Sequence, residues 1–277
     1  MIPTVEAQKV DFSMYSDFIH YAETIDCGKV YPLSIAEGIQ DGEIFTNSIN
    51  DHSVVLFWHH SGFAFLAGKP DETFLEKIYE LILNKNNTNP RRFILLVKDE
   101  KIEKFFQLKE NIILEKRYLF EYPQKERSVD FNLPAGYELR EINTSLLSGI
   151  HGNIVPSLFW KDIDKFFERG KGYCIVHDNH IAAWAFSAAI SSKEIDIGIE
   201  TDKDYRNRGL AAIVANRMIQ YAVEEGKAPV WACHYQNIAS KRTAEKIGFV
   251  KTAECSIIKR KVYSCNRSGY DRQAALY

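Results

Sequence analysis

The pattern of apolar and polar positions predicts an α/β fold for the first half of the chain. Short apolar runs bounded by turn residues predict strands there, over residues 54–58, 63–67, 93–97 and 112–122. Apolar residues at helical spacing predict two helices between them, one that begins at residues 70–73 and one over residues 100–108. This alternation of strands and helices is typical of α/β and α+β domains.

The second half of the chain also alternates between strands and helices. Its apolar runs predict strands over residues 137–142, 173–177, 181–187, 195–201, 230–235 and 250–258. Helical spacing predicts helices over residues 157–169, 209–225 and 238–247. Gly226 and Gly248 are expected to end the last two helices.

A polar segment between the two halves indicates a domain border. Residues 123–128 are polar and begin with a proline, and residues 133–136 have the composition of a turn. We therefore predict two domains, residues 1–127 and residues 128–277. Each has the size of an ordinary domain.

The strand predicted over residues 195–201 leads into a motif that favours binding of a phosphate group. Arg206-x-x-Gly209-x-Ala211 opens the next helix, and the first N–H groups of a helix have no partner inside it. Small residues at 209 and 211 would let phosphate oxygens approach those N–H groups. Arg206 and Arg208 add charged donors. The segment therefore predicts an anion site suited to a pyrophosphate.

A second motif lies downstream, and the two together resemble the GCN5-related N-acetyltransferase (GNAT) superfamily. Asn237-x-x-Ser240 and then residues 244–249 are similar to the family's Asn-x-x-Ala/Ser and Lys-x-Gly-Phe pattern. The first motif is similar to the family's acetyl-CoA loop. The resemblance implies a GNAT fold, with a mixed, splayed central sheet in the second half. It also implies an EC 2.3.1 type acyltransferase that moves an acetyl group from acetyl-CoA to a primary amine.

Looser similarities extend over most of the chain. They resemble the two-part bacterial acetyltransferases that include the zwittermicin A resistance protein, through residues 65–68, 117–120, 172–174 and 231–233. This subgroup implies a small-molecule acceptor such as an aminated antibiotic. The first half has no Arg-x-x-Gly-x-Gly/Ala motif. It is either a degenerate GNAT-like copy that lost cofactor binding or an unrelated smaller α/β domain that helps to shape the acceptor cleft.

The resemblance also implies which residues contact acetyl-CoA. In the family, pantetheine lies along the exposed edge of a strand that splays from its parallel neighbour, here residues 195–201 and 230–235. Gly198 would permit the bulge or close approach that the splay requires, or would pack tightly. Asn237 is also expected to cap the helix that it opens. The implied cofactor-binding residues are Ile199, Thr201, Arg206, Asn207, Arg208, Gly209, Leu210, Ala211, Asn237 and Ser240.

Two carboxylates on the strand of residues 195–201 are the candidate general bases. An alkyl amine with a pKa of ~10 is protonated at neutral pH and must lose a proton before it attacks. Strand alternation places Asp196 and Glu200 on one face, which in the family lines the acceptor cleft. Glu200 lies nearest the expected thioester. Alternatively, these carboxylates bind a cationic acceptor or face solvent, and proximity replaces a single base.

The general acid of the family has no counterpart at its usual place. Many members have a tyrosine seven residues after the position of Asn237, where this chain has Ala244. Tyr235 and His234 flank the expected cofactor, and their opposite strand parity lets only one of them face the cleft. His234 could equally be a structural histidine. A thiol with a pKa of ~8.5 can also leave as a thiolate without an acid.

The sequence is also compatible with two other functions. One keeps the fold and uses a longer acyl-CoA or an aminoacyl donor, although the intact pyrophosphate motif favours a CoA donor. The other is a non-catalytic acetyl-CoA-binding sensor. The presence of Ala244 in place of the usual tyrosine favours this alternative. Turnover of an amine would separate the enzymes from the sensor.

Composition and charge narrow the partners. The chain is 45% hydrophobic with a net charge of -2, which gives no electrostatic reason to bind nucleic acid or an acidic membrane. No apolar run reaches the ~20 residues that span a bilayer, and the N-terminus lacks the pattern of a signal peptide. A cytoplasmic location is expected. The oligomeric state is not predicted.

Cysteines and histidines predict neither disulfides nor a metal site. The chain has five scattered cysteines without a Cys-x-x-Cys pair. Reduced, mostly buried thiols are expected. His59 and His60 are expected in a hairpin turn without a third ligand at suitable spacing. We therefore expect no metal cofactor.

Overall fold

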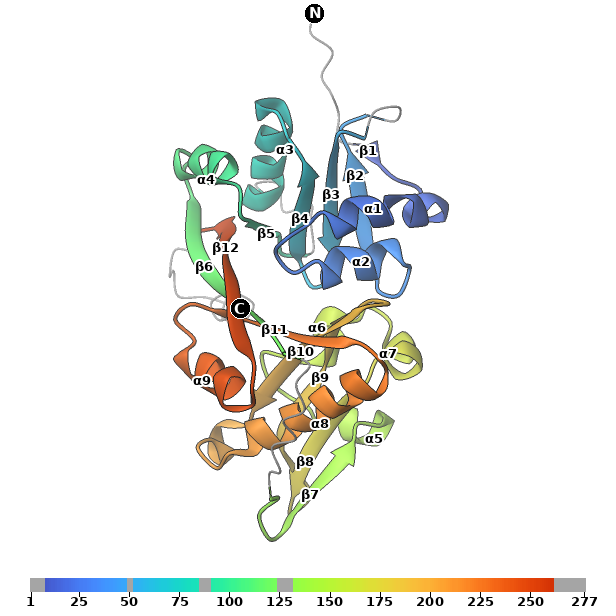
Figure 1. Cartoon of the computed structure of the whole chain (residues 1–277), viewed down its shortest axis with the longest axis vertical. Helices are drawn as coiled ribbons and strands as arrows, with labels where there is room; N and C mark the ends of the chain where they lie inside the picture. The colour runs from blue at the N-terminus through green and yellow to red at the C-terminus, as the bar shows by residue number, and fades with distance from the viewer. Residues whose placement is uncertain (1–7, 49–51, 85–90, 124–131, 262–277) are drawn as a thin grey trace, which may run out of the picture. The chain divides into compact units, whose positions relative to one another are not determined.

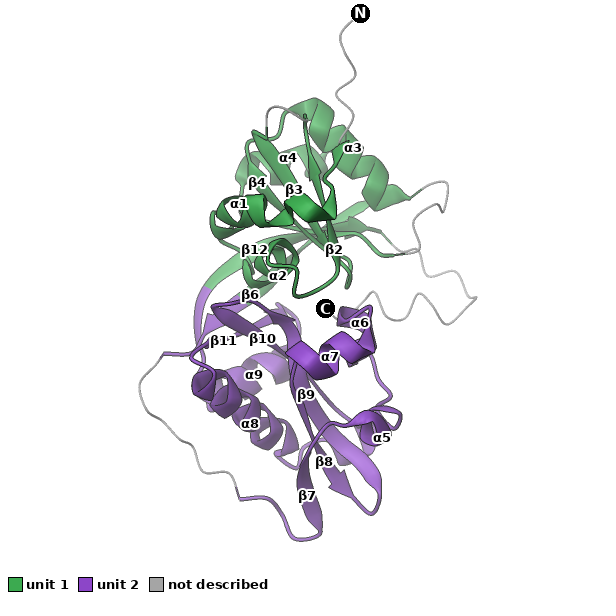
Figure 2. Cartoon of the chain, turned by 90° about the vertical axis from the view of Figure 1, so that its right-hand side faces the viewer, with its two compact units in different colours: residues 1–118, 253–277 green, residues 119–252 purple. Residues whose placement is uncertain are grey.

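The structure is a computed structural model that describes residues 8–48, 52–84, 91–123 and 132–261 (Figure 1). The chain divides into two compact units (Figure 2). Unit 1 comprises residues 1–118 and 253–277, and unit 2 comprises residues 119–252. The predicted domain border at 127/128 and the tail from Ser264 lie outside the described residues.

Unit 1 begins with short helices that the hydrophobic pattern does not predict. Its elements in chain order are β1 (Gln8–Lys9), the 3-10 helix η1 (Phe12–Phe18), α1 (Ile19–Glu23), α2 (Val30–Ala36), β2 (Gly42–Thr46), β3 (Val54–His59), β4 (Phe63–Gly68), α3 (Glu72–Leu83), β5 (Ile94–Val97), α4 (Glu100–Gln107) and β6 (Ile112–Glu121). From β3 onward they match the predicted elements. The unit border lies inside β6, between Tyr118 and Leu119.

The strands of unit 1 form an antiparallel run followed by one parallel step. β1, β2, β3 and β4 pair as antiparallel neighbours, with Leu56 opposite Leu66 in the last pair. β4 and β5 are parallel, and α3 supplies the crossover that a parallel pair needs. β12 (Val250–Arg260) is antiparallel to β5 from Ser256 to Ile258. The last strand of the described residues therefore pairs within unit 1, far from it in the sequence.

Unit 2 holds the elements that carry the two family motifs. They are β7 (Tyr137–Glu141), α5 (Thr144–Leu147), α6 (Pro156–Phe159), α7 (Ile163–Arg169), β8 (Gly172–His177), β9 (His180–Ile190), β10 (Glu194–Thr201), the 3-10 helix η2 (Lys203–Tyr205), α8 (Leu210–Glu224), β11 (Ala228–His234) and α9 (Ile238–Lys246). β7, β8, β9 and β10 are antiparallel neighbours, and β10 and β11 are parallel. Here α8 makes the crossover.

The two units therefore share one topology. Each has four successive antiparallel strands, a crossover helix and a parallel strand, in that order. The predicted α/β fold with a mixed sheet is confirmed. The shared topology favours the hypothesis that the first half is a GNAT-like copy.

One predicted helix is wrong. The chain forms α6 and α7 in place of a single helix over residues 157–169, because Trp160 is extended (φ -113°, ψ 113°). Its buried indole donates a hydrogen bond to the carbonyl of Ser187 at 2.8 Å. Asp162 then caps α7 by accepting a hydrogen bond from the N–H of Asp164. Anchoring the tryptophan in the core outweighs continuation of the helix.

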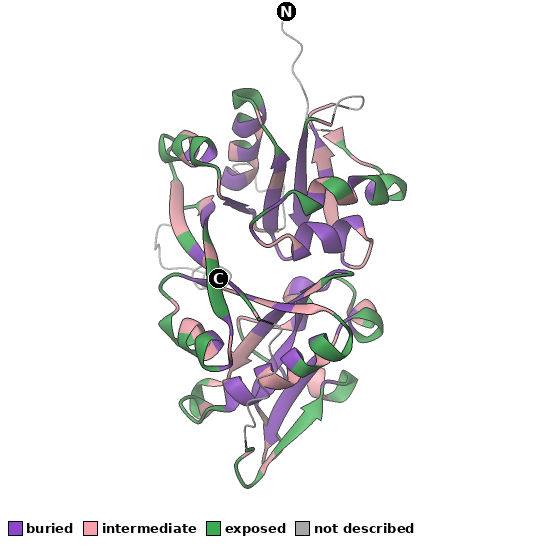
Figure 3. Ribbon diagram, in the orientation of Figure 1, coloured by how far each residue is buried: buried purple, intermediate pink, exposed green. Residues whose placement is uncertain are grey.

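Figure 3 shows where the buried residues lie along the ribbon of each unit, and most of these buried residues are apolar. In unit 1, Leu56 and Leu95 from the strands share a buried cluster with Ile78 of α3 and Phe106 of α4. In unit 2, Trp184 of β9 is fully buried, as is Trp160. Well-packed interiors hold the strand ends at which a site can form.

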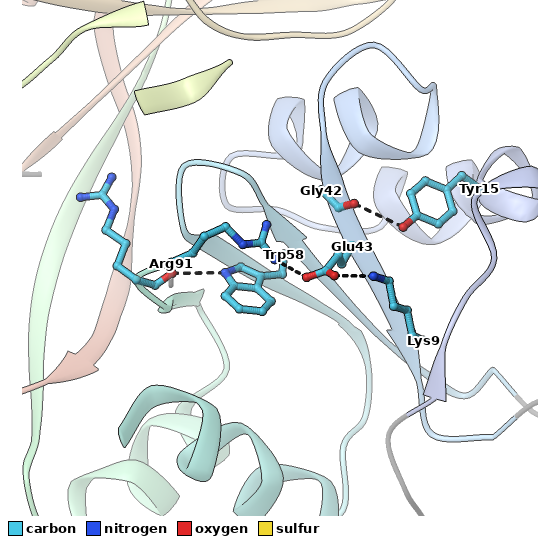
Figure 4. A network of polar contacts seen from close by, with 7 residues as sticks. Lys9, Tyr15, Gly42, Glu43, Trp58 and Arg91 are labelled. Atoms are coloured by element: carbon cyan, nitrogen blue, oxygen red, sulfur yellow. Dashed lines mark hydrogen bonds and ion pairs between the residues drawn. The ribbon is translucent and has the colours of Figure 1, made fainter. Parts of the chain in front are cut away.

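A polar network ties the edge of the unit 1 sheet together (Figure 4). The Glu43 carboxylate of β2 pairs with Lys9 of β1 and with Arg91, which precedes β5. The Arg91 guanidinium lies 4.0 Å from the ring centre of Trp58 on β3. These contacts connect several segments of one sheet, so we assign the network a structural role.

Candidate active site

β10 and β11 separate soon after they begin. In the described part of the chain their parallel pairing runs only from Glu194 opposite Ala228 to Asp196 opposite Val230. β10 stays paired with β9 as far as Thr201. The edge of β10 that faces β11 is therefore open beyond Asp196, which is the arrangement that a bound pantetheine requires.

Gly198 serves close packing. A Cβ atom at Gly198 would lie 2.9 Å from the Phe186 ring and 3.1 Å from the Cβ of Ala188. The irregularity in the pairing with β9 lies earlier, between Asp196 and Ile197. Of the roles predicted for Gly198, these contacts support tight packing, and the irregularity in strand pairing lies elsewhere.

α8 begins without a side-chain cap. Its N-cap residue, Gly209, is exposed and left-handed (φ 78°, ψ 0°), and it makes no side-chain cap bond to the first turn. Asn207 is also left-handed (φ 62°). A Cβ atom at Gly209 would have no heavy atom within 4 Å. The first turn of α8 is therefore open to an approaching group.

These features fit a diphosphate. Leu210 is buried (1% exposed) and packs into the core, whereas Arg208 and Gly209 just before it are exposed. The uncapped N–H groups and the helix dipole favour an anion at this position. The amides of Gly209, Leu210 and Ala211 are the groups that would hold it. The N-cap residue of α8 is a glycine and so brings no carboxylate of its own to compete for them.

The two arginines of the motif lie differently. The guanidinium of Arg208 donates to the Tyr137 hydroxyl at 2.7 Å and to the Asp204 carbonyl at 3.0 Å, and it lies over the Tyr205 ring. Arg206 donates from Nε to the Thr201 carbonyl at 3.4 Å. Arg208 is therefore fixed against the start of β7, and Arg206 lies beside the end of β10.

The two predicted carboxylates lie in different surroundings. Asp196 is buried, 5% exposed, at the last residue pair of β10 and β11. Glu200 is partly buried, and its Oε2 accepts hydrogen bonds from the N–H groups of Asn153 (2.8 Å) and Ile154 (2.7 Å). Burial raises the pKa of Glu200 above its ordinary value, opposed by these N–H groups and by the charge of Arg206.

Sequence reasoning missed the partners of Glu200. Trp184 lies opposite Glu200 in the pairing of β9 with β10. Its indole N–H donates to the carbonyl of Ile154 at 2.6 Å. The register of two antiparallel strands could have indicated Trp184, whereas the loop around Asn153 carries no motif.

His234 and Tyr235 differ in exposure. His234 is 4% exposed, and its Nδ1 accepts a hydrogen bond from the N–H of Gln236 at 3.3 Å. Tyr235 is 37% exposed, and its hydroxyl accepts a hydrogen bond from the Gln236 side chain. Of the two, Tyr235 is the one placed to meet a ligand from solvent.

Asn237 caps α9 as predicted. Its side-chain oxygen accepts a hydrogen bond from the N–H of Ser240 at 3.1 Å. The Ser240 hydroxyl accepts the indole N–H of Trp231 at 3.1 Å. Ala244 is fully buried in α9. These residues shape the turn that follows β11.

Other candidate chemistry is absent or structural in the described residues. The cysteines described there are buried and free, namely Cys27, Cys174, Cys233 and Cys255. His59 at the β3–β4 turn is fully buried, and burial lowers its pKa to about 3. No group of three or more His, Cys, Asp or Glu within these residues is arranged to hold a metal ion. Among the described helices, none is long and apolar enough to cross a membrane.

Known proteins are similar to this chain in sequence and in fold. The model of a family described as GNAT acetyltransferase matches residues 29–258. The uncharacterized N-acetyltransferase YdfB of Bacillus subtilis (strain 168) is 27% identical over 233 residues, which are 82% of this chain and 88% of that protein. The similarity therefore includes residues of both units.

Solved structures agree in fold. The GCN5-related N-acetyltransferase-like protein from Streptococcus suis 89/1591 has a TM-score of 0.69 at 19% identity, over 90% of this chain and 100% of that chain. A tandem GNAT protein from the clavulanic acid biosynthesis pathway has a TM-score of 0.58 at 9% identity, over 94% of this chain and 99% of that chain. The shared fold thus covers both halves of the chain.

Proposed function

Because this chain belongs to the GNAT acetyltransferase family and is an acyl-CoA-dependent N-acetyltransferase, we propose that unit 2 acetylates a primary amine of a small molecule. The acetyl group comes from acetyl-CoA, and the amine attacks directly in a ternary complex. One observation carries the proposal. An open strand edge on β10 leads into a helix whose first turn has neither a capping side chain nor a Cβ at Gly209.

The residues of unit 2 divide the binding of acetyl-CoA between them. The amides of Gly209, Leu210 and Ala211 hold the diphosphate, with Arg206 and Arg208 beside them. The open edge of Ile199–Thr201 bonds the pantetheine. When bound, acetyl-CoA supplies an acetyl group activated as a thioester. A backbone N–H of β10 that polarises the thioester carbonyl would contribute ~10²–10³ in rate.

The proton chemistry needs little from side chains in this proposal. The amine loses its proton to solvent and attacks as the free base, and its placement next to the thioester supplies much of the rate. The thiol leaves as a thiolate, since its pKa of ~8.5 makes a general acid unnecessary. Ala244, at the position where many family members have a tyrosine, has no proton to donate, which supports a mechanism without a general acid. Tyr235 is the exposed alternative for an acid.

The acceptor class rests on resemblance alone. Members of the family act on small-molecule or protein amines, and the two-part subgroup suggests an aminated natural product. An aminopolyol antibiotic is therefore the first acceptor to test, ahead of polyamines and aminoglycosides.

A thiol-release assay tests the proposal. The purified chain is incubated with acetyl-CoA or octanoyl-CoA and a panel of aminopolyols, polyamines and aminoglycosides, while cofactor binding is measured separately by calorimetry. We expect turnover of at least one amine, faster with acetyl-CoA. Faster turnover with octanoyl-CoA would assign a longer acyl donor. Tight cofactor binding without turnover of any amine would contradict the proposal and favour a sensor.

A further inference from the structure

A cross-strand pair in unit 2 clamps a distant loop. Glu200 of β10 lies opposite Trp184 of β9, so both side chains emerge at one level of the sheet. Glu200 Oε2 accepts the N–H groups of Asn153 and Ile154, and the Trp184 indole donates to the Ile154 carbonyl. Three hydrogen bonds thus fix three consecutive peptide groups on the sheet.

Gly152 allows the loop to lie directly on this pair. A Cβ atom there would lie 2.3 Å from Glu200 Oε2 and 2.8 Å from the Trp184 ring. The φ of Gly152 is not in the left-handed region, so space and not backbone strain selects glycine here. Glycine at position 152 therefore lets the loop backbone lie in contact with the Glu200 carboxylate.

We call Glu200 and Trp184, with the loop residues that they bind, the clamp. It lies beside the position that the proposed function gives to the incoming amine. Glu200 lies on the part of β10 that has separated from β11, where the proposed function places the thioester. Residues 152–154 lie in the segment between β7 and β8. The clamp therefore fixes one piece of that segment beside the reacting groups, an inference that rests on the proposed function.

The hydrogen bonds compete with proton transfer. An ionised carboxylate is an acceptor, and N–H groups bond it more strongly than they bond a neutral acid. If Glu200 took the proton of the amine, both bonds to Asn153 and Ile154 would weaken during the reaction. The loop would then loosen at the moment when the geometry of attack matters most.

We propose that Glu200 is a positioning residue that holds Gly152–Ile154 as a wall of the acceptor site and does not act as the general base. The amine keeps its solvent route for the proton. The residue thereby controls how the acceptor binds, and Trp184 supports it from the neighbouring strand.

Glu200→Gln and Glu200→Ala separate the two roles. The glutamine oxygen still accepts both N–H groups but cannot remove a proton from an ammonium group. We expect E200Q to keep kcat/KM for the amine within about threefold of wild type, with an unchanged pH profile. E200A should raise KM for the amine about tenfold with a smaller change in kcat. A general base would instead cost E200Q ~10²-fold or more in kcat and remove an acidic limb from its pH profile, which would overturn the proposal.

Hydrogen exchange reports on the clamp without any turnover. The amides of Asn153 and Ile154 should exchange slowly in wild type and E200Q and at least tenfold faster in E200A. Equal protection in E200A would overturn the proposal. If no amine is acetylated, the proposed function fails while this measurement still decides the clamp.

Two further variants control for folding. Glu224→Gln removes a carboxylate that pairs with Arg217 at the far end of α8, and it should leave KM and exchange unchanged. Trp184→Phe removes the bond to the Ile154 carbonyl and also part of a buried ring, so it is compared with wild type in thermal stability, and it should raise KM for the amine about threefold with normal acetyl-CoA affinity. An unchanged KM in W184F, with faster exchange at Ile154, would also contradict a role of the clamp in acceptor binding.

Discussion

The first turns of α3 and α8 occupy the same place in two copies of one topology but have opposite chemistry. α3 begins at a carboxylate, because Asp71 caps it by accepting a hydrogen bond from the N–H of Phe74 at 2.8 Å. Glu72 adds a second negative charge in the first turn. α8 begins at Gly209 with no capping side chain and with two arginines just before it.

The difference shows how a shared fold gains or lacks a site. A helix start attracts an anion in either case, and in α3 that anion is part of the chain. The cap stabilises α3 and fills the position at which a diphosphate would bind. In α8 the same position is left open, at some cost in helix stability. In the proposed function, topology therefore sets the position of the cofactor site, and the identity of the N-cap residue decides whether a ligand can use it.

Copying the α3 cap onto α8 should have the largest effect. Gly209→Asp would place a carboxylate on the N–H groups of the first turn and repel the diphosphate. We expect coenzyme A affinity to fall by ~100-fold or more, since at least two charge-assisted hydrogen bonds are lost. In Gly209→Asn the new side chain has the size of aspartate, tolerates a positive φ and carries no charge. We therefore expect coenzyme A affinity to fall by only about tenfold. Calorimetry measures both.

Gly226 supplies the matched control at the other end of α8. It also has a positive φ (68°) and open space around an added Cβ. Gly226→Asn should match Gly209→Asn in thermal stability and leave coenzyme A affinity unchanged. Wild-type affinity in Gly209→Asp would place the cofactor away from α8.

Releasing Arg208 should have a smaller effect on cofactor affinity. Arg208→Ala removes one charged donor and should weaken coenzyme A binding by about tenfold at low salt. Tyr137→Phe leaves the charge but removes the hydroxyl that fixes it, so a loss of about threefold is expected. Arg217→Ala, farther along α8, should have no effect on affinity. If Tyr137→Phe lowered coenzyme A affinity more than Arg208→Ala does, Tyr137 could not act only by fixing Arg208.

Removing the cap of α3 should have the smallest effect, and only on stability. Asp71→Ala should lower the free energy of unfolding by about 1 kcal/mol, because the N–H of Phe74 loses its acceptor. Coenzyme A affinity should not change. Asp99→Ala provides the comparison, since Asp99 caps α4 of the same unit. Weaker coenzyme A binding in Asp71→Ala alone would mean that α3 takes part in the cofactor site.

The sequence predicts the parts of the site that are local. The Gly209 turn and the Asn237 cap each depend on a few consecutive residues, and spacing is enough to predict them. The contact between Glu200 and Asn153 joins positions far apart in the chain, and only the register of β9 and β10 brings Trp184 to it. No spacing rule contains that information.

The elements that the sequence does not predict have physical reasons too. Every residue of α2 is buried, so the helix lacks the polar face that produces a helical period. The break after α6 depends on the hydrogen bond from the Trp160 indole to the carbonyl of Ser187, a residue of β9. In both cases tertiary packing, and not the local sequence pattern, determines the secondary structure.

Hydrogen exchange with and without acetyl-CoA shows whether the cofactor binds at the start of α8. The first amides of a helix have no acceptor within it, so those at the start of α8 should exchange fast in the free protein. Bound acetyl-CoA should slow exchange at Leu210 and Ala211 and leave Glu72 and Thr73 of α3 unchanged. Protection at the start of α3, or unchanged exchange at Leu210 and Ala211 in the presence of saturating acetyl-CoA, would contradict the account.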